Sequence, residues 1–442
     1  MSVYARQKIL VVGLGLSGSS ALRYLVREGA LAVATDSRAE IKGLEALRAE
    51  FPQVEFRLGG FSAPAPLSQL RMAVLSPGVP VEDPFVRELA AAGVEIVGDV
   101  ELFARAANAP VIGITGSNGK STTTTLVGEM ARAAGLRVGV GGNLGTPALD
   151  LLDPQAQLYV LELSSFQLET TSSLRCKAAT ILNLSQDHLD RHGTMAHYGA
   201  VKARIFHHCE SALVNRDDPE TLRLGPPGAH SFGIDAPAAG QYGLVRHEGA
   251  DWLACGDERL LPLSELRIFG LHNAANALAA LALADAAGLP RAASLQALRS
   301  FRGLPHRCEF VAELGGVQYF NDSKGTNVGS TLAALLGLPA PIVWLAGGQG
   351  KGQSFTELRA ALAAKGRAAV LFGEDAPAIE RDILGSLPVY RVPDMKAALR
   401  KARDLAQAGD RILLSPACAS FDQFRSYVDR GEQFRAAVEA LR

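Results

Sequence analysis

Cysteine is scarce in this chain, with five residues in 442. They are Cys176, Cys209, Cys255, Cys308 and Cys418, which lie far apart in the sequence and form no CxxC pair. We therefore expect neither a disulfide framework nor a thiolate zinc site. Such cysteine usage is typical of a reducing compartment, so we expect a cytoplasmic protein.

An excess of charge of one sign is also missing. The 44 Lys and Arg residues nearly balance 45 Asp and Glu residues, which gives a net charge of -1. No overall field attracts nucleic acid or an anionic membrane, and we expect neither as a partner. Long apolar runs are missing too, because glycines interrupt residues 9–16 and polar side chains, Asn276 and Asp285, interrupt residues 274–287. We expect no signal peptide and no membrane-spanning helix.

Glycine, by contrast, is abundant, with 45 residues, and 48% of the chain is hydrophobic. This composition is that of a globular chain and excludes disorder and collagen. At about 150 residues per domain, the length predicts about three domains. Short leucine-rich or β-branched runs that end in glycine alternate with alanine-rich stretches at helical spacing. This alternation predicts an α/β fold with mostly parallel sheets.

The chain divides into three βα segments. Strands are predicted at residues 8–12, 110–115, 317–320 and 342–346, and helices at residues 17–28 and 101–107. We place boundaries near residues 98 and 303, which gives domains of residues 1–98, 99–303 and 304–442.

The middle segment contains an irregular stretch and a long helix. Residues 225–263 are punctuated by glycine and proline, which favours a small antiparallel insertion. Residues 270–288 predict an alanine-rich helix, in which Asn273 and Asn276 share one face. These two amides could bind a base or a ribose, or could simply be polar residues at a helix start.

The strongest motif is VIGITGSNGKSTTTT at residues 111–125, a strand followed by glycines and a Lys-Ser-Thr run that opens a helix. Backbone N–H groups and a helix N-terminus cradle phosphates, the lysine contacts the β/γ oxygens and the hydroxyl binds Mg²⁺. The strict P-loop spacing fails, because Ile114 stands where the first glycine belongs. The alternative is a structural glycine turn, but the order of strand, loop, Lys120, Ser121 and helix predicts an ATP site.

A second motif, VVGLGLSG, places Gly13, Gly15 and Gly18 after a strand, with Asp36 about 20 residues further on. Alone, it predicts a dinucleotide-dependent oxidoreductase. The chemistry requires only a pyrophosphate at a helix N-terminus and a carboxylate near a ribose or base, which a UDP-linked sugar also satisfies. The second phosphate site in the next segment argues against hydride transfer.

Two polar residues follow predicted strands after the P-loop. Glu162 follows residues 158–161 and His188 follows residues 180–184. Both are expected at the carboxyl ends of strands, where α/β sheets build sites. Glu162 could hold Mg²⁺; His188 could bind a second metal weakly, tolerate Mn²⁺ or position a proton. The alternative for each is an ordinary surface or core residue.

In the last segment, glycine-rich stretches carry Arg307, Lys324 and Lys351, which suit a reaction that accumulates negative charge between two domains. Solvated surface loops are the alternative for each. The chain has no GxSxG motif, so no covalent enzyme nucleophile is expected.

The motifs, in their order along the chain, resemble those of one enzyme family. They are GLGLSG, LSPGV, GITGSNGKST, GGNLG, ELSSFQL, DHLDRH, YGAVKARIF, GLPHR, NDSKGTN, GGQGKG and SPACASFDQFRSYVDRGEQF. Over nearly the whole chain they resemble the Mur ligases of peptidoglycan synthesis, and the last motif resembles the member that adds D-glutamate. The resemblance implies a Rossmann-like N-terminal domain that binds UDP, a central P-loop ATPase-like domain and a Rossmann-like C-terminal domain.

The resemblance also implies a reaction. ATP would phosphorylate the carboxylate of UDP-N-acetylmuramoyl-L-alanine, and the amine of D-glutamate would attack the acyl phosphate to give a tetrahedral intermediate. The implied cofactors are ATP and Mg²⁺, with two metal sites and Mn²⁺ as a substitute. The implied enzyme is a cytoplasmic monomer.

Site residues of the family carry over to matching positions. ATP would bind Gly116, Asn118, Gly119, Lys120, Ser121, Thr122, Asn273, Asn276, Arg307 and Asp322. The metal would bind Ser121, Glu162, His188 and a carbamylated Lys202, and the catalytic residues would be Lys120, His188 and Lys202. The UDP substrate would contact Leu16, Ser17, Asp36, Arg38, Ser76, Pro77, Gly78 and Asn143. D-Glutamate would contact His306, Lys324, Thr326, Lys351, Ser420 and Tyr427.

Two positions depart from the family pattern: Gly325 replaces a common alanine and Tyr427 a frequent phenylalanine. The nearest alternative function is a Mur-type ligase for a different amino acid. A folate-polyglutamating ligase would lack the UDP domain, and an oxidoreductase would not need the P-loop. A GTP switch would need NKxD, whereas the sequence at Asn215 is NRDD.

Overall fold

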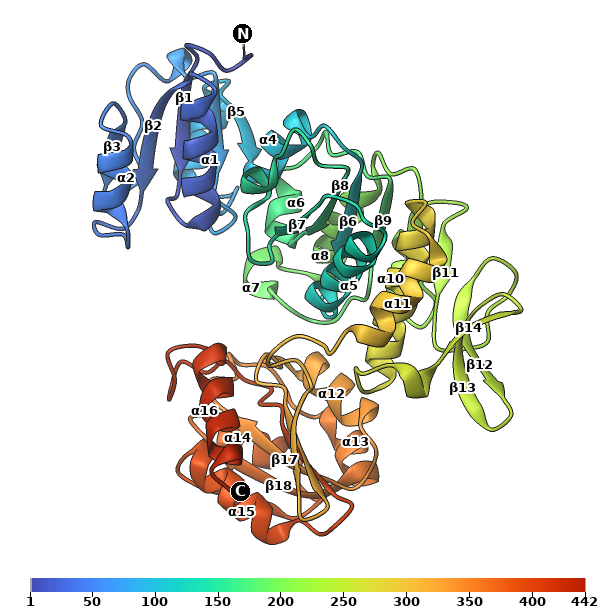
Figure 1. The fold of residues 1–442 in the computed structure, drawn as a ribbon. Coiled ribbons are helices and arrows are strands. Elements are labelled where there is room, and N and C mark those ends of the chain that lie inside the picture. The colour runs from blue at the N-terminus through green and yellow to red at the C-terminus, as the bar shows by residue number, and fades with distance from the viewer. Residues whose placement is uncertain (1, 442) are drawn as a thin grey trace. The chain divides into compact units, whose positions relative to one another are not determined.

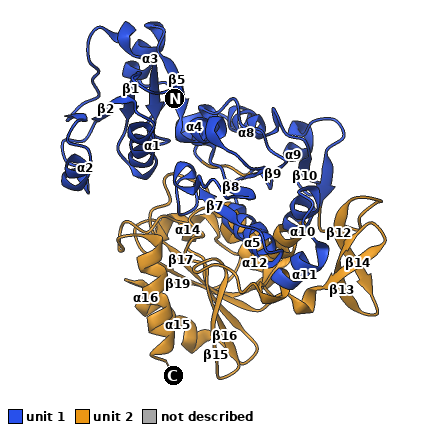
Figure 2. Ribbon diagram, turned by 45° about the horizontal axis from the view of Figure 1, so that its top comes forward, with its two compact units in different colours: residues 1–184, 188–232, 279–297 blue, residues 185–187, 233–278, 298–442 orange. Residues whose placement is uncertain are grey.

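The computed structural model describes residues 2–441, which form two compact units. Unit 1 consists of residues 1–184, 188–232 and 279–297, and unit 2 of residues 185–187, 233–278 and 298–442 (Figure 2). No helix among the described residues is both long and apolar enough to cross a membrane.

Unit 1 begins with a five-stranded parallel sheet in the order β3-β2-β1-β4-β5. Its elements are β1 (Lys8–Val12), α1 (Leu16–Arg27), β2 (Leu31–Asp36), α2 (Leu44–Glu50), β3 (Glu55–Leu58), β4 (Met72–Leu75), α3 (Pro84–Ala91) and β5 (Glu95–Gly98). The central strands β1 and β4 are apolar and buried, as expected where helices cover both faces of a parallel sheet. Figure 1 shows α1 lying against one face of this sheet, alongside β1.

A second set of parallel strands follows in unit 1, in the order β11-β10-β9-β6-β8-β7, and forms the parallel part of a nine-stranded sheet. Its strands are β6 (Val111–Thr115), β7 (Val138–Gly142), β8 (Leu158–Glu162), β9 (Ala178–Ile181), β10 (Ala212–Asn215) and β11 (His230–Phe232). Its helices are α5 (Lys120–Ala133), α6 (Ser165–Glu169), α7 (Leu189–His192), α8 (Met195–Ala203) and α9 (Pro219–Leu224). Strand β6 lies between β8 and β9, so the loop that follows β6 emerges between the ends of two neighbouring strands.

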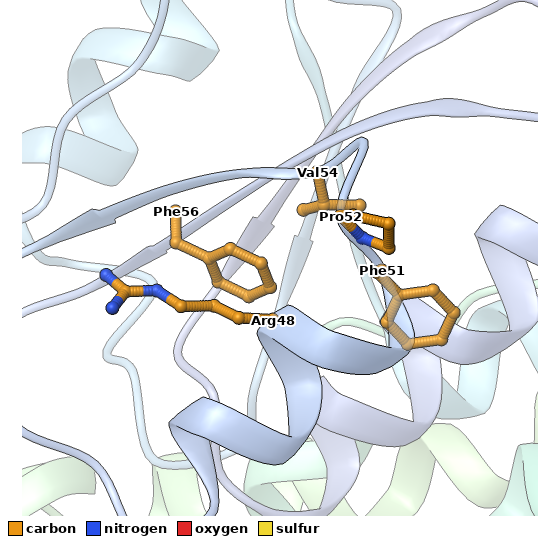
Figure 3. A pocket seen from close by; sticks show the side chains of 5 residues that line it. All are labelled: Arg48, Phe51, Pro52, Val54 and Phe56. Carbon is orange, nitrogen blue, oxygen red and sulfur yellow. The ribbon is translucent and has the colours of Figure 1, made fainter.

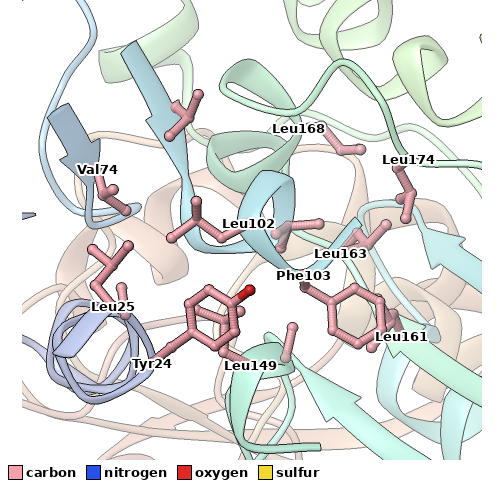
Figure 4. Packing of buried hydrophobic residues seen from close by; sticks show 14 of the residues in the cluster. Tyr24, Leu25, Val74, Leu102, Phe103, Leu149, Leu161, Leu163, Leu168 and Leu174 are labelled. Atoms are coloured by element: carbon pink, nitrogen blue, oxygen red, sulfur yellow. The ribbon is translucent and has the colours of Figure 1, made fainter. Parts of the chain in front are cut away.

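One hydrophobic core joins the two sheets of unit 1. Helix α4 (Asp99–Ala106) connects them and buries Leu102 and Phe103 completely. Figure 4 shows these side chains packed with Leu25 of α1, Val74 of β4 and Leu161 of β8. Because this apolar surface is buried from both sides, the two sheets of unit 1 are stabilised together.

Unit 2 contains an antiparallel meander and a six-stranded sheet. The meander is β12 (Tyr242–His247), β13 (Ala250–Cys255) and β14 (Glu258–Pro262). The sheet has the order β15-β16-β20-β17-β18-β19, and only β15 in it runs antiparallel to its neighbour. Its strands are β15 (Glu309–Leu314), β16 (Val317–Asn321), β17 (Ile342–Gly347), β18 (Gly366–Phe372), β19 (Val389–Arg391) and β20 (Arg411–Leu414).

Helices cover this sheet and connect the units along the chain. They are α12 (Val328–Gly337), α13 (Leu358–Lys365), α14 (Ala376–Asp382), α15 (Met395–Leu405) and α16 (Tyr427–Glu439). Two more, α10 (Leu271–Ala286) and α11 (Arg291–Ser300), have residues in both units. Trp344 of β17 is fully buried and donates its indole N–H to the carbonyl of Ser415, 2.8 Å away, so its polar atom is satisfied within the core.

The predicted α/β class and the predicted elements are present, with two corrections. The strand expected at residues 180–184 is β9, and it ends at Ile181, because the next residues turn to hydrogen-bond the P-loop. The antiparallel insertion is also shorter than residues 225–263, because β11 still pairs in parallel with β10. The long helix with Asn273 and Asn276 on one face is α10, where their side chains hydrogen-bond at 3.2 Å.

Candidate active site

The first glycine turn, residues 13–18, borders a cavity of about 700 Å³ in unit 1. All eight residues predicted for the UDP substrate line it: Leu16, Ser17, Asp36, Arg38, Ser76, Pro77, Gly78 and Asn143. Gly13 has φ +85°, and a Cβ on Gly18 would lie 1.8 Å from its carbonyl oxygen. The turn therefore requires glycine for its backbone angle at the first position and for close packing at the second.

Asp36, at the end of β2, fixes the geometry beside this turn. Its Oδ2 accepts the backbone N–H of Leu14 at 2.7 Å, and Arg38 donates two side-chain hydrogen bonds to the carboxylate. Burial alone would raise the pKa of Asp36, but these hydrogen bonds outweigh it and hold the pKa at about 2. The carboxylate is therefore ionised at neutral pH, and it orders Arg38 at the rim of the cavity.

The P-loop, residues 116–121, connects β6 to α5. Gly119 adopts the left-handed conformation, φ 81°, immediately before the helix. Lys120 lies in the first turn of α5, and its Nζ donates to the carbonyls of Gly116 and Ser117, both at 2.9 Å. Ser121 and Thr122 are buried beside it. A positive helix end, backbone amides and an ammonium group thus converge in an arrangement suited to phosphate.

Asn183, which the sequence reasoning did not single out, braces this loop. Its side chain accepts the N–H of Asn118 at 2.8 Å and donates to the carbonyl of the same residue at 3.1 Å. Its own carbonyl accepts the N–H of Ser117. The sequence does carry a signal for this role: Asn183 is an amide two residues after the end of β9, and β9 is a neighbour of the P-loop strand β6.

Lys202 of α8 is almost fully buried behind the P-loop. Its Nζ donates to the carbonyl of Gly116 at 3.0 Å and to the hydroxyl of Thr115 at 3.3 Å, and it lies 4.7 Å from the centre of the Tyr198 ring. From the residues around it in the sequence, Lys202 would be expected to be a surface lysine, whereas the fold brings it to the P-loop.

Glu162, the last residue of β8, lies on the other side of β6. Asn143 donates to its Oε1 at 2.6 Å, whereas its buried Oε2 has no hydrogen-bond partner among residues 2–441. A buried carboxylate oxygen in this state is suited to a cation, since burial of an uncompensated charge is costly. Ser121 adds a buried hydroxyl, so this donor set fits a hard cation such as Mg²⁺.

His188 has φ 51° and an exposed side chain at the start of α7, and its ring lies 4.9 Å from that of Phe166.

The C-terminal candidates gather at one edge of the unit 2 sheet. The loops after β16, β20 and β17 carry Lys324, Ser420 and Lys351, and these parallel strands are neighbours. His306 precedes β15, whose antiparallel direction brings its start to the same edge. Lys351 is exposed, and its φ is 53°.

Three of these residues are in contact. Lys324 Nζ lies 4.1 Å from the centre of the Tyr427 ring, and its backbone N–H donates to the carbonyl of His306. The His306 and Tyr427 rings lie 6.3 Å apart, edge to face. Burial lowers the pKa of His306, so the ring is neutral at pH 7, and Asn321 donates to its Nδ1 at 3.0 Å. Thr326 follows in the same loop, where its N–H donates to the carbonyl of Lys324.

Asp322 is buried at the same edge. It accepts hydrogen bonds from the hydroxyl of Ser415 at 2.6 Å and from the N–H of Cys308 at 3.1 Å. Burial raises its pKa to about 7. A Cβ on Gly325 would lie 2.5 Å from Asp322 Oδ2, so the glycine found in place of the family's alanine gives this carboxyl its space. The predicted ATP residues are thus divided between P-loop positions in unit 1 and Asn273, Asn276, Arg307 and Asp322 in unit 2.

Arg430 of α16 is a second residue that the sequence reasoning missed. It is fully buried and donates to Ser323 after β16, to the carbonyl of Gly347 at the end of β17 and to that of Cys418 after β20. Burial lowers its pKa to about 10, so it remains charged at neutral pH. Arg430 therefore holds the three candidate loops together.

Another hollow in unit 1 contains none of the predicted residues. It measures about 290 Å³ and is lined by Arg48, Phe51, Pro52, Val54 and Phe56, on α2, β3 and the segment between them (Figure 3). With only one charged side chain and no convergent polar groups, it does not resemble a catalytic site.

Comparisons with known proteins agree with this layout. Three family models match: a Mur ligase MurD-like N-terminal domain at residues 7–98, a Mur ligase middle domain at residues 114–284 and a Mur ligase glutamate ligase domain at residues 306–418. The UDP-N-acetylmuramoylalanine--D-glutamate ligases of Methylobacillus flagellatus and Pseudomonas aeruginosa are each 51% identical to this chain. Each alignment covers 98% of this chain, and 97% and 98% of the relatives.

Solved structures support the fold. A pseudomurein peptide ligase type C from Methanothermus fervidus superposes with a TM-score of 0.62 at 18% identity, covering 99% of this chain and 100% of that chain. A UDP-N-acetylmuramate-alanine ligase from Thermotoga maritima gives a TM-score of 0.61 at 19% identity, covering 98% and 100%. At such low identity these two structures support the three-domain α/β architecture alone.

Proposed function

The chain belongs to the Mur ligase family, and on that premise we propose that it joins D-glutamate to UDP-N-acetylmuramoyl-L-alanine in an ATP-dependent amide ligation. The observation that carries the proposal is the 51% identity to D-glutamate ligases across 98% of the chain. We further propose domains of residues 1–98, 99–303 and 304–442, which bind the UDP substrate, ATP and the amino acid. A cytoplasmic monomer is part of the same proposal.

The first step is activation of a carboxylate, which is a poor electrophile. The terminal phosphoryl group of ATP moves to the carboxylate of the UDP substrate, giving an acyl phosphate and ADP. Lys120 and the P-loop amides would hold the phosphates, and their positive potential would stabilise the negative charge that the transferred group carries. Gly116, Asn118, Gly119, Ser121 and Thr122 complete this part of the proposed ATP site.

Residues around the P-loop would hold the metal. Ser121 and the unpartnered oxygen of Glu162 fit Mg²⁺, which neutralises phosphate charge when bound, and His188 is proposed for a second site where Mn²⁺ can substitute. Lys202 would fit this metal site only after carbamylation. Its neutral amine would attack CO₂, forming an N–C bond and losing a proton. The lysine side chain, ordinarily a cation, would thereby become a carbamate anion whose oxygens can bind a metal.

The second step is attack by D-glutamate. Its amine displaces phosphate from the acyl carbon through a tetrahedral intermediate, and His188 is proposed to accept the amine proton. Lys324 and Lys351 would pair with the carboxylates of D-glutamate, and His306, Thr326, Ser420 and Tyr427 would shape the pocket. Asn273, Asn276, Arg307 and Asp322 are proposed for the base and ribose of ATP.

The UDP moiety is assigned to the cavity beside the first glycine turn. Its pyrophosphate fits the N-terminus of α1, where Leu16 and Ser17 begin the helix. Asp36 and Arg38 would lie near the uracil, with Ser76, Pro77 and Gly78 opposite, and Asn143 would face the substrate from the central domain.

The decisive experiment measures phosphate release with ATP and Mg²⁺ while each substrate is omitted in turn. Release that requires both substrates and prefers D-glutamate over L-glutamate, L-lysine and glycine is the expected result. Release with another amino acid would retain the acyl-phosphate chemistry and make the chain a Mur-type ligase of different specificity. No release with any amino acid would overturn the proposed reaction.

A further inference from the structure

Three side chains with metal-binding chemistry gather in unit 1 outside the residues assigned above. Glu169 ends α6, His192 ends α7 and His197 lies in the first turn of α8. One ligand atom from each lies within 4.8 Å of the others. The three residues belong to successive helices, so a cation bound here would connect those helices.

His192 is the buried member of this cluster. Its side chain has no exposed surface, and its Nε2 lies 2.9 Å from the hydroxyl of Ser165. Its buried Nδ1 makes no hydrogen bond within the part of the chain that the structure describes, and it lies 3.4 Å from Glu169 Oε1. When Ser165 accepts the Nε2–H, the lone pair of Nδ1 faces the carboxylate. A cation between the two atoms removes that repulsion.

Glu169 is held in position for such a cation. One guanidinium nitrogen of Arg191 donates both to its Oε2 at 3.0 Å and to the carbonyl of Val79 at 3.2 Å, which fixes the end of the arginine side chain. With Oε2 held by this pairing, the other oxygen of Glu169, Oε1, faces His192. His197 is exposed, so its ring is able to adjust its rotamer.

The distance between His192 and Glu169 suits a tetrahedral ion. With bonds of about 2.0–2.1 Å, two ligands of a tetrahedral zinc lie about 3.3 Å apart. The 3.4 Å between His192 Nδ1 and Glu169 Oε1 already meets this spacing. The hydrogen bond of Ser165 to the other ring nitrogen is the kind of contact that fixes the tautomer of a metal-bound histidine.

We propose that Glu169, His192 and His197 bind a divalent transition-metal cation of the Zn²⁺ type, with water in the fourth position. Two imidazoles and one carboxylate favour such an ion over Mg²⁺. Because α7 begins after His188 and α8 carries Lys202, the bound ion stabilises the segment that supplies both residues. The proposal does not depend on the identity of the ligase substrates.

The test is a zinc titration of the full chain against a chromophoric chelator, without ATP or substrates. In the His197→Gln variant we expect one zinc equivalent to be lost or bound at least about tenfold more weakly. The matched control, His230→Gln, removes an exposed histidine from β11 and should bind zinc like the wild type. Ser165→Ala is expected to weaken binding by about 10- to 100-fold through loss of its hydrogen bond to His192.

A second variant separates this site from the proposed magnesium site. His188→Asn should retain the zinc equivalent that depends on His197, and zinc should raise the melting temperature of wild type by more than that of His197→Gln. Identical titrations for wild type and His197→Gln would overturn the proposal and leave Nδ1 as a donor to Glu169. Neither outcome changes the expected phosphate release, so failure here is distinct from failure of the ligase function.

Discussion

The two glycine-rich turns of unit 1 have the same local form and different chemistry. Each follows a buried parallel strand, contains a glycine at positive φ and opens a helix. In the first turn, the helix begins with the exposed, uncharged Leu16, and the nearby charge is the Asp36–Arg38 pair. In the P-loop, the helix begins with Lys120, whose ammonium group donates hydrogen bonds to carbonyls of the loop itself.

This difference indicates how one structural element supports two tasks. Both turns have helix N-terminal amides that suit phosphate, and both have a buried carboxylate at the end of a neighbouring strand. In the first turn that carboxylate, Asp36, is paired with Arg38, whereas Glu162 beside the P-loop has an oxygen without a hydrogen-bond partner among residues 2–441, and Lys120 adds an ammonium group to that loop. The first turn is thus suited to holding a diphosphate, and the second to transferring a phosphoryl group.

The largest expected effect is the loss of the P-loop cation. Lys120→Met keeps the length of the side chain and removes its charge, so kcat should fall by about 10³-fold, as for other charge-stabilising groups. Binding of the UDP substrate, measured by calorimetry, should be unchanged because the first turn is intact. A decrease in kcat of less than tenfold would contradict the difference between the turns.

The next effect concerns packing of the first turn. Gly18→Ala would place a Cβ 1.8 Å from the carbonyl oxygen of Gly13 and 2.6 Å from the hydroxyl of Ser76. We expect a loss of about 3 kcal/mol in stability, seen as a lower melting temperature. Gly15→Ala is the matched control, since nothing lies within 4 Å of its added Cβ, and its stability should change by less than about 0.5 kcal/mol. Equal melting temperatures for the two variants would refute the packing argument.

A smaller effect is expected when the brace of the P-loop is removed. Asn183→Ala loses two side-chain hydrogen bonds to Asn118, which should raise the KM for ATP by about tenfold. Asn108→Ala is the control, because that amide bonds to Tyr159, Asp153 and Pro154, away from the loop. The same KM shift in both variants would indicate a general loss of order instead of a specific brace.

The smallest effect is the acid dependence of the first turn. The folded pKa of Asp36 is about 2, below its ordinary 3.8, so its ion pair stabilises the protein above pH 4, and that contribution is lost as the pH falls through 2. Between pH 5 and pH 3, wild type should lose about 1 kcal/mol relative to Asp36→Asn, and less at high salt. Urea unfolding of both proteins across this range measures the difference, and parallel pH profiles would contradict it.

Sequence reasoning was most successful for elements defined by local pattern. The predicted strand at residues 8–12 is β1, and the predicted helix at residues 17–28 is α1, shifted by one residue. The strand expected at residues 180–184 ended early, because Asn183 leaves the ladder to bind a loop 65 residues earlier in the sequence. No periodicity in a short window contains that contact.

The residues of the candidate site also differ in how far the sequence could identify them. Lys120 and Ser121 were identified from one contiguous motif, whereas Lys202 was assigned only from family resemblance, and the fold then placed its Nζ beside Thr115 and Gly116. Arg430 was not identified at all. Its donors reach three loops that are far apart in the sequence, and an arginine among the polar residues of a helix gives no local sign of burial.

By itself, the sequence determined the α/β class and the two glycine turns, because strand period, helix spacing and left-handed glycines are properties of a few consecutive residues. For the same reason the phosphate chemistry of the P-loop was a prediction that the sequence alone could make. The tertiary structure alone decided which side chains became buried, paired or charged. It gave Asp36 its arginine, left Glu162 with an unpartnered oxygen and brought His192 to Glu169. Burial and electrostatic interaction depend on neighbours in space, and strand order brings those neighbours together from distant parts of the chain.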